Sequence, residues 1–547
     1  MPALKLRSNY EGLLMTLSAL LLGILFGTFY CMCGCGGGGG GHLRENGDSD
    51  EGSGEVSSGP WKRIPIACIE AGSIDNPRVQ ASLDSSGKVH IVYFCDNSGA
   101  DCPAGSTGKL TGNSLVSSID SSTADSFTVD SSTADSSTAS YTVNYMVGSI
   151  VLNRQDTYPY YLIGRYLMDQ GPECIACTDN YLSLALTLTQ DDCPVTQDDC
   201  PVVAYRGGTR RGCEGEGGQQ QHQSDVMISI RDSGSGNGSG TWESWTGAEG
   251  SLKAGASGGG ASESDSFLML AGSEVSAVTD SKGCIHLSYQ VLSEKCGAAD
   301  SSANYADLYY VKIDPSTHGT QATSERVEED QHDSPHFIGS HCAITLDRDE
   351  NRDEIPVIFY YAEIPDKTSG QQVRGLRVAR KEGGAWNRKW IELLWADPGC
   401  EVDSISCARG SQNGYGYMGV AYAIKDTEPG GSVYHHLQYA CTDRQFSSWQ
   451  VQTVDDYPSC GEYCSLAFDS RGFPAIAYHK PLDYSGYPGI IFACFNGSSL
   501  TWDKEVVSAE GDIGLCNNLW LDNYNRPFIC SYSSSQKTIY LFYRDPP

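Results

Sequence analysis

One pattern of alternating large and small residues recurs along the chain. Its clearest copy begins at Ser465, and its large residues are Leu466, Phe468, Ile476 and Tyr478. Successive side chains of a strand point to opposite faces, so the two apolar runs predict strands with one bulky face and one nearly flat face. Small residues on the second face indicate that both faces are covered. The Asp-Ser-Arg-Gly between the runs predicts a type I turn that closes a hairpin, with glycine in the left-handed position.

The repetition of this hairpin predicts the architecture. A tyrosine follows a glycine by six residues at Gly87/Tyr93, Gly283/Tyr289, Gly416/Tyr422 and Gly472/Tyr478. Looser copies occupy 344–360 and 519–532, and a copy at 184–205 is stretched by an insertion. The last four copies are spaced by about sixty residues, which is enough for four strands and their turns. We therefore expect an all-β, seven-bladed β-propeller of four-stranded blades.

The two ends of the chain are predicted to share one blade. Residues 61–66 resemble the Trp-led outer strands expected at 449–454 and 502–507, yet they precede the first hairpin. The chain ends at 538–543, which would be a third strand without a fourth. Closure of the last blade by the N-terminal strand removes an exposed sheet edge at the seam.

The N-terminus predicts export. Lys5 and Arg7 precede an apolar stretch at 13–29, as in a signal peptide. A cysteine behind a small residue and before a glycine tract resembles a bacterial lipoprotein signal, with Cys35 as the expected lipidated residue and Cys33 or Cys31 as the alternatives. An ordinary cleaved signal and a retained single span remain open, because the run approaches the length that crosses a bilayer. The expected location is the bacterial cell envelope or surface.

The sequence divides into three parts. Residues 1–35 form the signal or lipoprotein segment, and 36–58, rich in glycine, serine and acids, are expected to be a flexible tether. The propeller occupies 59–547, with long loop insertions near 98–140 and 206–265 that contain short tandem copies. Such low-complexity segments are expected to be loose loops.

Charge narrows the set of partners. The formal net charge of −31 argues against nucleic acid, whose phosphates require a basic face, and against electrostatic attachment to anionic lipid. We therefore expect membrane contact only through the N-terminal anchor, a monomeric propeller, and a protein or a glycan as the partner.

Cysteine usage predicts disulfides. Three of the 22 cysteines lie in the signal region, and in an exported chain the others are typical of cross-links. The close pairs that are candidates to staple loops are Cys193/Cys200, Cys400/Cys407 and Cys460/Cys464.

One acidic hairpin is a candidate calcium site, and calcium is the only cofactor that the sequence suggests. Its oxygen-bearing residues at alternate positions are Asp347, Asp349, Asn351 and Asp353. Such oxygens can converge on a hard cation, although the sixth position is arginine rather than glycine and no glutamate follows at the twelfth. The alternative is a solvated acidic turn, neutralised by its own arginines.

Histidines and tyrosines offer further candidates. His90 and His286 occupy one repeat position, which favours packing, and the spacing of His332, His336 and His341 allows a metal site only if the backbone folds back. His435 and His436 open a strand, so their rings point to opposite faces and cannot chelate together. The repeated tyrosine is expected to be buried, whereas a ring of exposed tyrosines would stack sugars.

The hairpin phrase resembles the SLALDxxGxPxIAY repeats of bacterial secreted β-propeller proteins, which look related to the sialidase-like propellers. The resemblance implies a fold and an envelope location more than an activity. The ordered Ser-x-Asp-x-Gly-x-x-Trp box of sialidases is missing, and no arginine trio or catalytic residue is assigned. We therefore expect a binding or scaffold module rather than an enzyme. The alternative is a carbohydrate-active enzyme, a sialidase-like hydrolase or a lyase, whose acids meet at the channel mouth, about 5–10 Å apart for hydrolysis.

Overall fold

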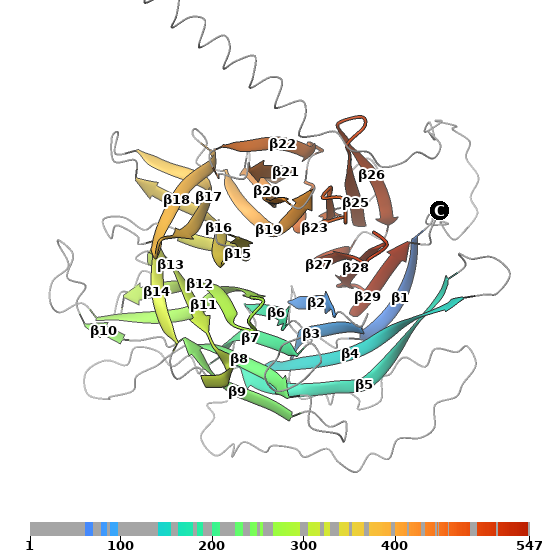
Figure 1. Ribbon diagram of the computed structural model, residues 1–547, viewed down its shortest axis with the longest axis horizontal. Coiled ribbons are helices and arrows are strands. Elements are labelled where there is room, and N and C mark those ends of the chain that lie inside the picture. Colours follow the sequence, from blue (N-terminus) through green and yellow to red (C-terminus); the bar gives the residue numbers. More distant parts are fainter. Residues whose placement is uncertain are drawn as a thin grey trace, which may run out of the picture.

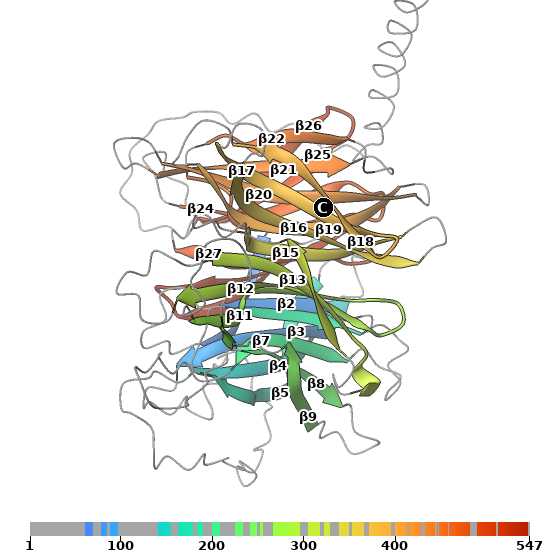
Figure 2. The same cartoon turned by 90° about the vertical axis from the view of Figure 1, so that its left-hand side faces the viewer.

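The computed structural model of the chain describes residues 61–68, 78–84, 88–96, 141–154, 162–178, 183–189, 200–207, 225–232, 241–248, 252–254, 266–295, 305–317, 322–328, 338–348, 353–365, 371–394, 400–412, 415–427, 433–442, 446, 448–457, 459–481, 489–509 and 512–544. Their strands form seven antiparallel sheets around a common centre (Figure 1), and Figure 2 shows the same ring from the side. The prediction of a seven-bladed, all-β propeller is confirmed.

The first three blades are each made of strands that are consecutive in the sequence. Blade 1 contains β2 (Val79–Leu83), β3 (Lys88–Asp96), β4 (Tyr141–Arg154) and β5 (Leu162–Thr178). Blade 2 contains β6 (Leu184–Leu188), β7 (Pro201–Gly207), β8 (Asp225–Asp232) and β9 (Thr241–Ala248). Blade 3 has five strands, β10 (Leu252–Ala254), β11 (Ser266–Thr279), β12 (Ile285–Lys295), β13 (Tyr305–Ile313) and β14 (Thr323–Glu328), with the short helix η1 (Pro315–Thr317) between the last two.

The remaining blades have four strands each. Blade 4 contains β15 (Ile338–Arg348), β16 (Glu354–Pro365), β17 (Gln372–Glu382) and β18 (Ala385–Leu393). Blade 5 contains β19 (Glu401–Gln412), β20 (Tyr415–Thr427), β21 (Val433–Thr442) and β22 (Trp449–Asp455). Blade 6 contains β23 (Glu462–Phe468), β24 (Pro474–Lys480), β25 (Gly489–Asn496) and β26 (Thr501–Ser508). Blade 7 contains β27 (Ile513–Leu521), β28 (Pro527–Ser533), β29 (Thr538–Arg544) and β1 (Trp61–Cys68).

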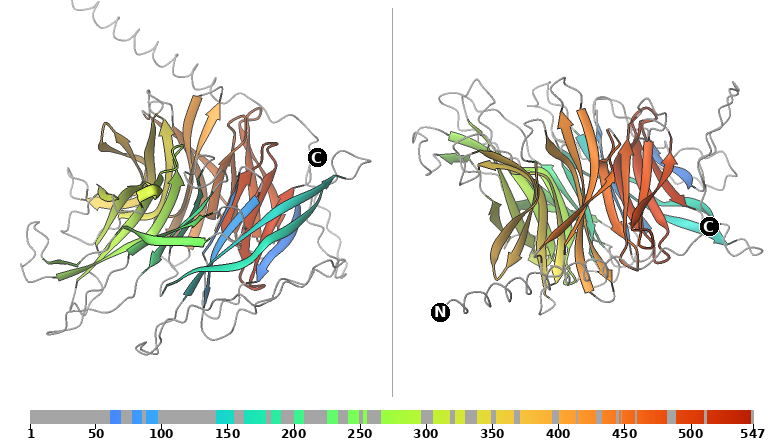
Figure 3. Two further views of the ribbon diagram at one scale, coloured as in Figure 1. Left: turned by 60° about the horizontal axis from the view of Figure 1, so that its bottom comes forward. Right: turned by 90° about the horizontal axis from the view of Figure 1, so that it is seen from above.

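The closure of the last blade by the first strand is also confirmed. β1 pairs antiparallel with β29, with Trp61 opposite Arg544 and Pro65 opposite Tyr540. Figure 3 shows β1, in blue, beside the red C-terminal strands. Trp61 is 3% exposed; its ring lies 5.4 Å from that of Phe492 in blade 6, and its indole N–H donates to Glu505. The N-terminal strand therefore ties blade 7 to its neighbour as well as completing it.

The hairpin turns form as their sequence predicts. In blade 6 the Gly472 N–H donates to the Asp469 carbonyl, and Gly472 has a φ of 89°. The Asp469 carboxylate accepts the N–H groups of Arg471 and Phe473, which makes aspartate a cap for the turn. In blade 7 the left-handed position is taken by Asn525, whose φ is 60°.

The repeated tyrosines are buried, as expected, and they join neighbouring blades. Tyr478 is fully buried, and its hydroxyl donates to Asp455 at the end of the preceding blade's outer strand (2.6 Å). Tyr360 makes the same contact with Glu328, and Tyr422 contacts Glu392. A ring of exposed tyrosines that stacks sugars is therefore ruled out at these positions.

The serine of the phrase links the inner strands of consecutive blades. The Leu519 N–H of β27 donates to the Ser465 hydroxyl of β23 (2.9 Å). The N–H groups of Leu466 and Ile344 make the same bond to a serine of the preceding blade. Each inner strand thus presents a backbone donor to its neighbour, which explains why a small polar residue occupies this position.

The disulfide prediction is wrong for the two close pairs that the structure describes. Cys400 and Cys407 lie along one extended segment and Cys460 and Cys464 along another, and all four are thiols. Strand geometry separates residues seven apart by about 23 Å and residues four apart by about 13 Å, well beyond the Cα distance of a disulfide. Cys193, the other half of the third pair, lies outside the described residues.

The N-terminal predictions also lie outside the described residues. These are the signal segment with Cys35, the tether and most of the loop insertions. Within the residues that the structure does describe, no helix is long and apolar enough to cross a membrane.

Candidate functional site

The inner strands of the seven blades, β2, β6, β11, β15, β19, β23 and β27, contact one another around the ring. Five of them carry an irregularity ahead of the hairpin turn. The pairing register shifts between Ala271 and Val275, Ser340 and Ala343, Val402 and Ser404, Glu462 and Ser465, and Leu515 and Asn518. A bulge leaves residues out of the ladder and re-aims their side chains. We call this end of the ring the upper end.

One repeat position supplies a different functional group in each of five blades. It lies six residues before the aspartate of the hairpin turn, and its occupants in blades 1, 3, 4, 6 and 7 are Arg78, Glu274, His341, Tyr463 and Cys516. Three of them have left-handed backbones although they are not glycine, with φ of 53° at His341, 51° at Tyr463 and 55° at Cys516. Such conformations cost about 1–3 kcal/mol each and cluster at functional sites.

Arg78 lies in an acidic field at the upper end. Burial alone would lower its pKa, but the Glu274 carboxylate, with Asp403 adding to it, outweighs burial and raises the pKa. Cys516 and Tyr463 act in the same direction. Groups from blades 3, 5, 6 and 7 therefore act on one guanidinium from blade 1.

The tightest group at the upper end is a carboxylate–imidazole triad of Asp403, His435 and Glu462. His435 Nε2 lies 3.0 Å from Asp403 Oδ2 and 3.2 Å from Glu462 Oε1. The three ligand atoms all lie within 4.8 Å of one another. The His435 side chain is buried, whereas those of Asp403 and Glu462 remain 29% and 28% exposed, so the triad can be reached by a solute.

Two buried polar side chains near the triad have unused hydrogen-bonding capacity. His479, at the end of β24, is 6% exposed and neither of its ring nitrogens makes a hydrogen bond; Nδ1 lies 3.5 Å from Glu462 Oε2. Asn517 in β27 donates its amide to the Tyr463 carbonyl, but its own buried Oδ1 is unpaired. Buried polar atoms are rarely left in this state, so each calls for a further partner.

The charge state of Asp403 follows from its neighbours. Burial would raise its pKa, but the hydrogen bond with His435 and the nearby His341, whose Nε2 lies 3.7 Å from Asp403 Oδ1, lower it overall. Asp403 is therefore an anion at neutral pH. Next to it, Lys425 pairs with Glu401, which raises the Lys425 pKa.

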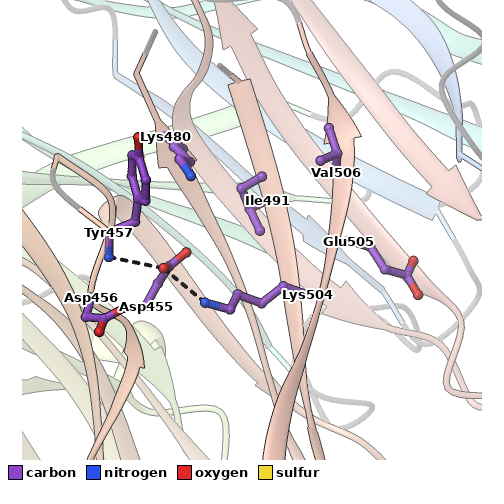
Figure 4. Close-up of a pocket in the computed structure, with 8 residues that line it drawn as sticks. All are labelled: Asp455, Asp456, Tyr457, Lys480, Ile491, Lys504, Glu505 and Val506. Atoms are coloured by element: carbon purple, nitrogen blue, oxygen red, sulfur yellow. Dashed lines mark hydrogen bonds and ion pairs between the residues drawn. The ribbon is translucent and has the colours of Figure 1, made fainter. Parts of the chain in front are cut away.

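A second polar site opens between the outer parts of blades 5 and 6 (Figure 4). Its main charges already have partners within the protein. Lys504 pairs with Asp455 at 3.0 Å, and the Lys480 ammonium sits 3.6 Å from the centre of the Tyr457 ring. This pocket joins two blades, and it lacks the unused polar groups of the upper end.

The repeat-position histidines are structural, as expected. His286 is buried between the Tyr310 hydroxyl (2.8 Å) and Asp280 (3.1 Å), which is the capping aspartate of its turn. His90 makes the same two contacts, with Tyr145 and Asp84. The ionised Asp280 also holds the Lys312 ammonium at 2.8 Å.

The calcium site stays a prediction. Asp349 and Asn351 lie outside the described residues, and Asp353 is exposed. Asp347 accepts two hydrogen bonds from Arg380, so an arginine from the next hairpin already neutralises it. His332 and His336 also lie outside the described residues. His341 is the one described member of these three histidines, and it lies at the upper end.

Sequence reasoning missed Asp403, Glu462 and His479 and did not connect His435 with them. The sequence does carry a signal for the two acids. Asp403 stands three residues before Ser406, and Glu462 stands three residues before Ser465. Because both serines link inner strands in the same way, the two acids occupy equivalent positions in adjacent blades. The two histidines come from other strands and carry no such signal.

The comparisons with known proteins bear on the fold. No protein-family model matches the chain, and no curated protein matches its sequence. Among solved structures, an alpha-L-arabinanase of Penicillium chrysogenum complexed with arabinobiose is 10% identical, over 66% of this chain and 93% of that one, with a TM-score of 0.38. The alpha-L-arabinofuranosidase Arb93A of Fusarium graminearum is 11% identical over 66% of this chain and 92% of that one (TM-score 0.37). A Trypanosoma rangeli sialidase in complex with sialic acid is 11% identical, over 77% of this chain and 57% of that one (TM-score 0.36).

With identities near 10% and TM-scores below 0.5, these likenesses carry no argument about the activity of this chain. The resemblance of the sequence to secreted bacterial propeller repeats stays a prediction, because no sequence family supports it. The chain is a seven-bladed β-propeller, closed by its own N-terminal strand, that is structurally similar to an arabinanase, an arabinofuranosidase and a sialidase.

Proposed function

We propose that the protein binds a glycan at the upper end of the ring. The observation that carries this proposal is the convergence of donors and acceptors from several blades around partly exposed carboxylates. Asp403 and Glu462 are acceptors, Arg78 is a donor, and Asn517 Oδ1 is an acceptor without a partner. Each sugar hydroxyl both donates and accepts, so it needs this mixture, whereas a purely cationic or anionic ligand needs one kind alone.

The remaining features of the upper end fit a polar ligand of this kind. Tyr463 stands beside Glu462 with its ring 6.2 Å from that of His479, which supplies aromatic surface next to the polar groups. The net charge of −31 disfavours phosphate-rich ligands. The proposal includes attachment to the envelope through Cys35, which would hold the propeller where it meets extracellular glycans.

A second candidate is hydrolysis of a glycosidic bond at the same place. It is favoured by the spacing of Asp403 and Glu462, whose nearest oxygens are within 4.8 Å, close to the roughly 5 Å between the two carboxylates of retaining glycosidases. The lowered pKa of Asp403 keeps its carboxylate ionised, as a nucleophile requires.

A glycan array together with chromogenic glycosides tests both candidates on the full chain. Binding of one glycan class that falls at least tenfold in Asp403→Asn and Glu462→Gln, but persists in the exposed control Tyr524→Phe, supports the binding site. Release of product that the same two variants abolish favours the hydrolase. Absence of any glycan binding, or binding unaffected by both variants, overturns the proposal.

A further inference from the structure

We infer that Asp403, His435 and Glu462 form a binding site for a first-row divalent transition-metal ion, with His479 as an additional ligand. The inference deepens the proposed function, because the ion would sit among the groups proposed to bind the glycan. Metal binding is nevertheless measured directly, so either proposal can fail while the other holds.

The spacing of the ligand atoms is that of a coordination shell. With metal–ligand bonds of about 2.1 Å, neighbouring ligand atoms lie about 3.0–3.4 Å apart in octahedral and tetrahedral sites. His435 Nε2 lies 3.0 Å from Asp403 Oδ2 and 3.2 Å from Glu462 Oε1, so both pairs match the edge of such a polyhedron. Only the two carboxylates, within 4.8 Å of each other, have to approach. Both are partly exposed and lie near solvent, so this adjustment disturbs no packed core.

The buried histidine beside the triad is an independent sign of a ligand. His479 is 6% exposed, its two nitrogens make no hydrogen bond, and Nδ1 faces Glu462 at 3.5 Å. The His479 ring is held in place by Gly514 of blade 7, where even one added methyl carbon would come within 2.8 Å of the ring. An imidazole fixed in this position beside a carboxylate, with no hydrogen bond of its own, is arranged as a metal ligand is.

The donor set selects the class of ion. Calcium and magnesium prefer shells made of oxygen alone, and structural zinc sites prefer thiolates. Two carboxylates with one or two imidazoles suit manganese, iron, cobalt, nickel or zinc in the divalent state.

The competing explanation is a protonated His435 shared by two acids. A single Nε2–H has one proton to donate, yet Nε2 faces both carboxylates at nearly equal distances. That account also leaves both nitrogens of His479 without a hydrogen bond. A metal ion bonded to Nε2 satisfies both carboxylates and offers His479 a ligand position.

Titration of the full, metal-stripped chain with Mn²⁺ and Zn²⁺ by calorimetry tests the site. Mn²⁺ is included because the thiols among the 22 cysteines bind it poorly. We expect one Mn²⁺ site per chain, an affinity for Mn²⁺ at least tenfold above that for Ca²⁺, and a metal-dependent rise in the melting temperature. His435→Gln and Glu462→Gln should each weaken Mn²⁺ binding at least 100-fold, and His479→Gln less.

The control is Glu401→Gln, which removes a neighbouring carboxylate that is paired with Lys425 and lies outside the triad. It should bind Mn²⁺ like the unaltered chain, and circular dichroism establishes that each variant is folded. No saturable Mn²⁺ binding, binding that folded His435→Gln retains, or a preference for Ca²⁺ would each overturn the inference. Metal binding without any glycan binding would sustain it and remove only the proposed function.

Discussion

At the scale of single residues, the repeated phrase combines fixed structural roles with one variable position. The turn aspartate is fixed because its carboxylate caps the amides of its own hairpin, as Asp469 and Asp280 both show. The position six residues earlier varies from arginine to cysteine, and in blades 3, 4, 6 and 7 it lies within the bulge, outside the regular ladder. Structure and chemistry are therefore carried by different residues of the same repeat.

Asp280 leads to a prediction about pH. Burial would raise its pKa, but hydrogen bonds from His286 and Lys312 lower it well below the ordinary value of about 3.9. The folded state thus favours the anion, and this contribution to stability is present above about pH 4 and is lost as the pH falls towards the folded pKa. Urea unfolding between pH 7 and pH 2.5 should show Asp280→Asn less stable at pH 7 but with a shallower decline below pH 4. An equally steep decline in the variant would contradict this account.

At the scale of the element, the inner strands depend on side chains because no ladder joins one blade to the next among the strands that the structure describes. The Ser465 hydroxyl is the acceptor for the Leu519 N–H, and the Ser276 hydroxyl for the Ile344 N–H. Such a bond holds two neighbouring inner strands in a fixed register, which keeps the bulges of adjacent blades level at the upper end.

Replacement of Ser465 by alanine should therefore destabilise the ring. The Leu519 N–H would lose its acceptor, and a buried unsatisfied donor costs about 1–3 kcal/mol. Chemical denaturation measures the difference, with exposed Ser470→Ala as the control expected to change stability by less than about 0.5 kcal/mol. Equal unfolding midpoints for the two variants would show that the serine contributes nothing at the seam.

The element scale also marks the limit of prediction from sequence. The hairpins, the buried tyrosines and the outer strands at Trp449 and Trp502 could be predicted because each depends on local alternation and turn chemistry. The triad could not, because Asp403 and Glu462 meet only when two blades are placed side by side, and His435 comes from a third strand. The predicted disulfide pairs were wrong because two cysteines that are close in sequence lie far apart in space when the segment between them is extended.

At the scale of the whole molecule, closure of the ring was predictable by counting strands, since the last copy lacked a fourth strand and the first had one too many. The structure also shows which contacts hold the closure. Trp61 packs against Phe492 and donates a hydrogen bond to Glu505 of blade 6. Arg544 pairs with the same glutamate at 3.1 Å. The two ends of the chain are thus fastened to a third segment as well as to each other.

Trp61→Ala tests this fastening. Loss of a buried tryptophan costs about 3–5 kcal/mol, and here it also releases the strand that closes the last blade. The melting temperature should fall by several degrees, whereas Lys62→Ala, one residue along on the exposed face, should leave it nearly unchanged. If both variants have the same melting temperature, the N-terminal strand does not hold the ring closed.

The pairing of β1 with β29 has a consequence for biosynthesis. The strand made among the first residues of the propeller has no sheet to join until its partner, which includes Thr538–Arg544, has left the ribosome. Chains that stop early therefore lack the site for their own first strand and keep an open edge, a feature that quality-control proteases and chaperones recognise. Closure of the ring therefore requires that synthesis has proceeded at least as far as β29.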